Sequence, residues 1–123
     1  MASQLNITVQ DGPPAMVAVA GELDIATGGL LRGVFREIIR AGRDTVVVDT
    51  SGLRFCDSTG LEILLEADSA TKRAGGGLRL AGVHGTLDVI LDATRLRHVF
   101  EIYESPAAAL LTETALVEAA LPR

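Results

Sequence analysis

The run Thr-Val-Val-Val-Asp at residues 45–49 constrains the fold more than any other part of this sequence. Its three central valines are β-branched, and no polar residue alternates with them. This pattern predicts a strand that is covered on both faces, as the inner strands of parallel sheets are. Helices on both faces of a sheet are the architecture of α/β proteins, so we expect residues 45–49 to form a central strand.

The segments around this run alternate between strand and helix patterns. Two short apolar runs are separated by Asp-Gly-Pro-Pro, which predicts a hairpin or at least two adjacent strands. Apolar residues at helical spacing predict three helices, and further short apolar runs predict two more strands. The first two strands would span residues 5–9 and 16–20, the helices residues 30–42, 61–74 and 86–91, and the later strands residues 78–81 and 100–103.

A last helix is predicted at Ser105-Pro106, because serine is a common N-cap and proline suits the first helical position. The residues of this helix that we expect to face the core are Leu110, Leu111, Ala115 and Leu121. Strand–helix–strand units form right-handed parallel crossovers. The element order therefore predicts an α/β fold, a single domain of residues 1–123 with a mixed, mostly parallel β-sheet packed with about four helices.

Composition argues against several kinds of partner. The formal net charge is −5, so attraction to nucleic acid or to anionic lipid is unfavourable. The three phenylalanines and one tyrosine are too few and too scattered to stack bases. With one cysteine, no secretory signal and no apolar stretch long enough to span a bilayer, we expect a cytoplasmic protein without membrane insertion.

The segment between the central strand and the second helix carries the most chemistry. We expect a loop at residues 50–57, after which Thr59 and Glu62 match the Thr-x-x-Glu capping box, and Ser58 or Asp57 would satisfy another free N–H. A helix cap is the ordinary role of such residues. A hydroxyl at a helix N-terminus is also where an added phosphate finds free N–H donors and the positive end of the helix dipole.

Two motifs resemble the signature of STAS-domain anti-sigma factor antagonists. One is Asp57-Ser58-Thr59-Gly60-Leu61 preceded by residues 46–53, and the other is residues 21–24, Gly-Glu-Leu-Asp. The resemblance covers nearly the whole chain and agrees with the predicted element order. It departs from the family at Arg95, where a glycine commonly follows the third helix, and a non-glycine residue in a left-handed C-cap is sterically strained.

The resemblance implies a protein-binding regulator. In that family the serine matching Ser58 is phosphorylated by an anti-sigma factor that is also a serine kinase, and a PP2C-type phosphatase removes the phosphate. The unphosphorylated form binds the anti-sigma factor and so releases the sigma factor. The resemblance further implies that Asp57, Thr59 and Gly60 are the recognition context of Ser58, with Asp24 beside them.

Enzymatic and metal-binding roles find little support in the sequence. The candidate bases for a serine nucleophile are only His84 and His98, and no Gly-x-Ser-x-Gly elbow or phosphate-binding loop is present. No metal-ligand spacing occurs, so we expect no metal and no cofactor. Cys56 is more simply a small buried hydrophobe than a redox sensor.

We expect Glu62 and Glu66 to form an acidic stripe with Asp68 nearby. This stripe would be either a face exposed to solvent or a face that docks a partner.

Other users of the same fold supply alternative functions. The chain would then be a constitutive STAS adaptor or scaffold, either a subunit of a lipid-transport complex or a component of a stress-signalling assembly. A sensor of a nucleotide or another small molecule is a third possibility. A lipid-transport subunit would associate permanently with an ATPase, and a scaffold would form large oligomers.

Overall fold

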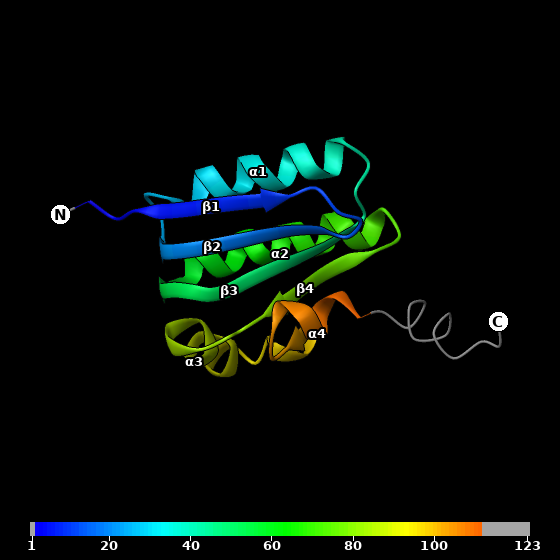
Figure 1. Ribbon diagram of the computed structural model, residues 1–123. Coiled ribbons are helices and arrows are strands. Elements are labelled where there is room, and N and C mark those ends of the chain that lie inside the picture. Colours follow the sequence, from blue (N-terminus) through cyan, green and yellow to red (C-terminus); the bar gives the residue numbers. More distant parts are fainter. Residues whose placement is uncertain (1, 112–123) are drawn as a thin grey trace, which may run out of the picture.

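A five-stranded sheet organises the molecule in the computed structural model, which describes residues 2–111 (Figure 1). The strands lie in the order β1-β2-β3-β4-β5, with β1 antiparallel to β2 and all later pairs parallel. The strands are β1 (Leu5–Gln10), β2 (Ala15–Leu23), β3 (Thr45–Cys56), β4 (Gly77–Ala81) and β5 (Glu101–Tyr103), and the helices are α1 (Gly28–Arg40), α2 (Ser58–Arg73), α3 (Gly85–Thr94), the 3-10 turn η1 (Arg97–Val99) and α4 (Pro106–Leu110). The predicted mixed, mostly parallel α/β fold is confirmed.

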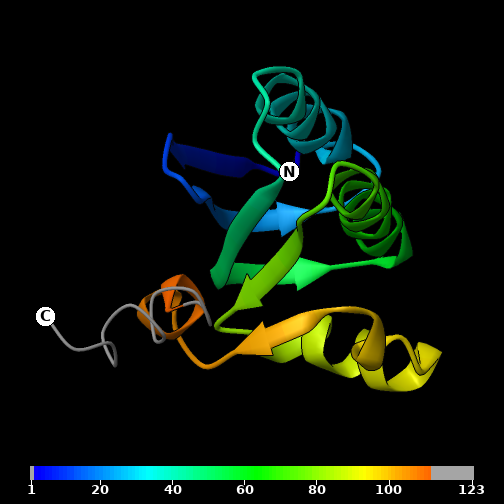
Figure 2. The same cartoon turned by 90° about the vertical axis from the view of Figure 1, so that its right-hand side faces the viewer.

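Strand β3 is central, as its valine run predicts. Val46, Val47 and Val48 are fully buried. Successive strand residues face opposite sides of a sheet, and Val46 and Val48 belong to the main core with α1, α2 and α3, whereas Val47 packs with Ala81 and Ala109 on the other face. Figure 2 shows α4 on the side of the sheet away from α1 and α2. The run is apolar throughout because both of its faces are covered.

The expected loop at residues 50–57 is wrong, because β3 continues to Cys56. The second half of β3 pairs with the end of β2 through two register shifts. Each shift changes which side chains face the core, so only Leu53 and Cys56 are buried among residues 51–56. Burial at every third residue matches neither strand nor helix periodicity, which is why this half reads as a loop.

The last described helix is shorter than the sequence suggests. Ser105 caps it as predicted, since its Oγ accepts a hydrogen bond from the N–H of Ala108 at 3.1 Å. Leu110 and Leu111 are exposed, contrary to prediction, and Ala109 is the buried residue that packs on the sheet. The other two residues expected to face the core, Ala115 and Leu121, lie outside the described residues.

Two further details concern the helix surfaces. Asp68 is buried and does not join the expected acidic stripe of α2: Lys72 Nζ lies 2.7 Å from its Oδ2, and the N–H of Leu78 donates to its Oδ1. Asp68 therefore links α2 to the start of β4.

Arg95 follows α3 with φ of +58°, the strained left-handed cap that the sequence indicates.

Candidate functional site

The candidate site lies where β3 ends and α2 begins. Asp57 is the N-cap of α2: its Oδ1 accepts a hydrogen bond from the N–H of Gly60 at 3.0 Å, and its carbonyl oxygen accepts from Leu61. The predicted capping box of Thr59 with Glu62 is therefore wrong, because the helix already begins at Ser58, which places Thr59 inside the first turn. Of the three caps considered from the sequence, Asp57 fills the role.

Ser58 is the first residue of α2 and is exposed to solvent. The first N–H groups of a helix have no acceptor within the helix. In the described part of the chain the Asp57 side chain satisfies the N–H of Gly60, and no acceptor is present for those of Ser58 and Thr59. The hydroxyl of Ser58 thus lies at the positive end of the helix dipole beside free donors, where a phosphate is favourably placed.

Asp24 lies on the neighbouring strand end. Leu23 is paired with Cys56, and the N–H of Asp57 donates to the carbonyl of Leu23 at 3.3 Å, so Asp24 and Asp57 leave the sheet side by side. A hydrogen bond from Ser3 lowers the pKa of Asp24, and the N–H groups of Ala26 and Thr27, which donate to its Oδ1, lower it further. The Asp24 carboxylate therefore organises the turn into α1.

Gly60 allows α2 to approach these strand ends closely. A Cβ at this position would lie 2.7 Å from Cys56 Sγ and 2.8 Å from Leu23 Cγ. Both distances are shorter than van der Waals contact, so any larger residue would displace the start of α2. Gly60 thus has a packing role. The structure places all five site residues predicted from the sequence on one edge of the sheet, around the start of α2.

A family model described as the STAS domain matches residues 4–109. The chain belongs to the STAS domain family. The anti-sigma F factor antagonist of Paenibacillus polymyxa is 29% identical over 96 residues, 77% of this chain and 82% of the relative. The anti-sigma-B factor antagonist of Bacillus subtilis is 27% identical over 99 residues, 80% of this chain and 90% of the relative.

The fold comparison agrees with the family assignment. The crystal structure of an anti-sigma factor antagonist from Mycobacterium paratuberculosis matches with a TM-score of 0.75 and 23% identity, over 87% of this chain and 92% of the other. The resemblance drawn from the two sequence motifs is confirmed at the level of the family. No described helix of this STAS domain has the length and apolar character needed to cross a membrane.

Sequence reasoning missed three exposed apolar side chains on segments that lead to or from the site residues. Ile25 follows Asp24 directly and is 83% exposed, Leu30 in the first turn of α1 is 60% exposed, and Phe55 is 41% exposed. Large apolar side chains in such positions are typical of protein-binding surfaces. Ile25 is a large apolar residue directly after Asp24 in the turn between β2 and α1, and this is the signal in the sequence that points to it.

The first turn of α3 also contributes to the site in a way the sequence does not show. Thr86 Oγ1 accepts a hydrogen bond from the N–H of Cys56 at 2.7 Å. This bond ties α3 to the last residue of β3, directly before the cap of α2. Among residues 2–111, no three His, Cys, Asp or Glu side chains gather in a way that would hold a metal ion.

We expect Cys56 to be chemically inert in the folded STAS domain. Burial in the core raises the pKa of the Cys56 thiol to about 12, and the neighbouring Asp57 carboxylate acts in the same direction. At a pH of about 8, on the order of one thiol in ten thousand is then ionised, and the thiolate is the reactive form. Alkylation by iodoacetamide should be at least about a hundredfold slower than in the urea-unfolded chain. Equal rates in the two states would restore the redox-sensor hypothesis.

Proposed function

We propose that this STAS domain is an anti-sigma factor antagonist switched by phosphorylation of Ser58. In the unphosphorylated state it binds a cognate anti-sigma factor, itself a serine kinase, and so releases the sigma factor. Phosphorylation ends this binding, and a PP2C-type phosphatase restores it. The observation that carries the proposal is the exposed hydroxyl of Ser58 at the first position of α2, on the edge of the sheet where Asp24 and Asp57 leave the strands.

The relatives support the general role. Both are named antagonists of anti-sigma factors, and each aligns with about four-fifths of this chain. Exposed apolar side chains at Ile25, Leu30 and Phe55 fit a surface that a protein partner covers. We propose that Asp24, Asp57, Thr59 and Gly60 shape this surface, and that residues 1–123 act in the cytoplasm as one domain.

Electrostatic repulsion would make phosphorylation an off switch. A phosphate adds about 1.5 to 2 negative charges at Ser58, next to the Asp57 carboxylate in a chain that is already acidic. The free N–H groups of α2 tolerate this charge in the free protein. In the complex, the same charge would be desolvated and brought against the partner. A combined cost of about 3 kcal/mol lowers affinity on the order of a hundredfold.

The proposed role is binding rather than catalysis. A serine nucleophile needs a base within hydrogen-bond reach. His84 Nε2 instead lies 2.9 Å from the carbonyl oxygen of Ser51, and His98 is in η1. In the described part of the chain, neither histidine is hydrogen-bonded to Ser58. The ATP and magnesium used in the phosphorylation step would belong to the partner kinase.

The test is phosphorylation followed by binding. The purified protein is incubated with ATP, magnesium and each anti-sigma kinase of its own genome, and peptide mass spectrometry should find one phosphate, on Ser58, that is absent from Ser58→Ala. With the cognate kinase, Ser58→Asp should bind on the order of a hundredfold more weakly than Ser58→Ala, by calorimetry. Gln10→Asp is the matched control, because Gln10 is exposed at the end of β1 that pairs with the start of β2, away from the end of β2 that precedes Asp24.

Two outcomes would contradict the proposal. Equal binding of Ser58→Asp and Ser58→Ala to the anti-sigma factor would remove the switch. Absence of phosphate with every kinase, together with stable binding to a transporter ATPase or with self-assembly, would assign the chain to a constitutive adaptor or scaffold.

A further inference from the structure

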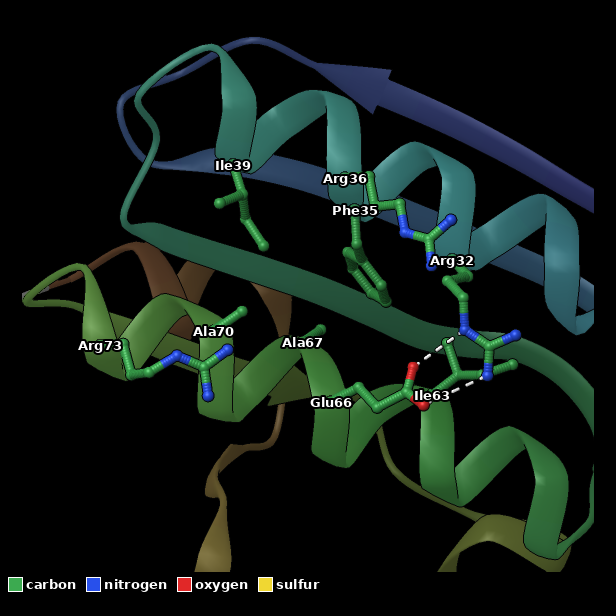
Figure 3. Close-up of a pocket in the computed structure, with 9 residues that line it drawn as sticks. All are labelled: Arg32, Phe35, Arg36, Ile39, Ile63, Glu66, Ala67, Ala70 and Arg73. Atoms are coloured by element: carbon green, nitrogen blue, oxygen red, sulfur yellow. Dashed lines mark hydrogen bonds and ion pairs between the residues drawn. The ribbon is translucent and has the colours of Figure 1, made fainter.

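A groove runs between α1 and α2, away from the start of α2 (Figure 3). The helices run parallel, because Gly28 meets Ile63 and Arg32 meets Glu66 one turn further along both helices. They touch at the first pair, where a Cβ on Gly28 would lie 2.4 Å from Ile63 Cδ1. Beyond this contact the helices leave a groove of about 190 Å³.

The walls of the groove differ in size. On α1 the apolar side chains are large, Phe35 and Ile39, whereas α2 places the small residues Ala67 and Ala70 opposite them. Figure 3 shows Phe35 and Ile39 directed into the space between the helices. The short side chains of α2 are therefore what keeps the groove open.

The groove is positively charged although the protein is acidic. Its lining contains three arginines and one glutamate, a formal charge of +2, while the whole chain carries −5. Glu66 already binds Arg32 through two hydrogen bonds of 2.9 and 3.3 Å. Within residues 2–111 neither Arg36 nor Arg73 forms an ion pair, and Arg73 donates only to Ser69 Oγ. Two guanidinium groups are thus available to carboxylates of a partner.

The size of the groove favours a side chain over a small molecule. Sites for drug-sized ligands occupy on the order of 300–1,000 Å³, more than this groove offers. A single leucine or phenylalanine side chain is a better match, and such anchors dominate protein interfaces. Arginine pairs well with carboxylates, often through two hydrogen bonds.

We propose that this groove docks an acidic segment of a protein partner. One large apolar side chain of the segment enters between Phe35 and Ala70, and carboxylates on either side of it bind Arg36 and Arg73. Because Arg73 lies 15 residues after Ser58 along α2, it is about 22 Å from the phosphorylation position. The end of the groove at Ala70 and Arg73 is therefore a second binding surface, distinct from the proposed switch, whereas the other end reaches Ile63, five residues after Ser58.

The test uses a synthetic peptide with one leucine flanked on each side by glutamates. Two matched peptides replace the leucine with serine or the glutamates with lysines. In a nuclear magnetic resonance titration of the full chain, the acidic leucine peptide should shift the amide signals of Phe35, Ile39 and Ala70. We expect it to bind at least about tenfold more tightly than either matched peptide. Equal binding of the three peptides, or shifts centred on Ser58, would overturn the proposal.

Variants of the chain complete the test. The double variant R36E/R73E should weaken binding at least about tenfold, and A70L should do the same by filling the groove without changing charge. Arg40 is exposed on α1, outside the groove, and pairs with Glu37, so R40E is the charge-matched control for the single variant R36E and should bind as the wild type does. Full binding by R36E/R73E, or an equal loss in R40E, would overturn the proposal. Because Arg36 and Arg73 are both exposed, this comparison holds even where A70L fails to fold.

Discussion

Replacing Leu64 with alanine should lower the free energy of unfolding by about 2–5 kcal/mol, the range for deleting a buried leucine side chain. Leu64 is fully buried on α2, in the same core cluster as Val48 and Leu80. Its removal costs the transfer free energy of the lost methyl groups and leaves a cavity under the helix that carries Ser58.

The matched control for this prediction is Leu30→Ala. Leu30 lies in a helix too, so the change in helix propensity is similar, but its side chain is 60% exposed. We expect its effect to stay within about 0.5 kcal/mol. Urea unfolding followed by circular dichroism measures both variants, and an equal loss in the two would show that Leu64 does not contribute to the core as its burial indicates.

Replacing Gly21 with alanine should cost about 3 kcal/mol, because two penalties combine. Gly21 has φ of +110°, which alanine adopts only with strain of about 1–3 kcal/mol. Its new Cβ would also lie 2.3 Å from the carbonyl oxygen of Gln4, a backbone atom directly before β1 that cannot rotate away. The paired end of β1 would have to separate from β2, and Ser3, which donates to Asp24, would move with it.

Gly42→Ala carries only the first penalty, so the difference between the two variants measures the second. Gly42 has a similar φ of +91°, but nothing lies within 4 Å of the position its Cβ would take. We expect this control to cost about 1 kcal/mol. Equal losses in the two variants, measured by urea unfolding, would mean that β1 yields without cost and that the close approach to Gln4 is unimportant.

The two proposed binding surfaces differ in their chemistry. The edge around Ser58 combines exposed apolar side chains with the carboxylates of Asp24 and Asp57, so added negative charge there opposes an acidic or desolvated partner surface. The groove between α1 and α2 instead presents arginines. A partner that carries both an acidic segment and a surface for the Ser58 edge would retain part of its affinity after phosphorylation, because only one of the two contacts is switched.

The sequence by itself determined the features that depend on neighbouring residues. The run Val46, Val47 and Val48 predicts a strand that is buried on both faces. Successive residues of a strand face opposite sides of the sheet, so three consecutive apolar residues place apolar side chains on both sides. Ser105-Pro106 predicts a helix start, and Asp57-Ser58-Thr59-Gly60 a capped helix, because capping joins groups only a few residues apart. The two family motifs located the candidate site for the same local reason.

Only the tertiary structure decided features that depend on residues distant in the chain. The second half of β3 is a strand because it pairs with β2 across two register shifts. These shifts remove the alternation of buried and exposed residues by which a strand is recognised in a sequence. Asp68 is buried because the N–H of Leu78 and the ammonium of Lys72 satisfy it. The groove exists because α1 and α2 touch at Gly28 and then face each other with side chains of unequal size, and no local pattern encodes the distance between two helices.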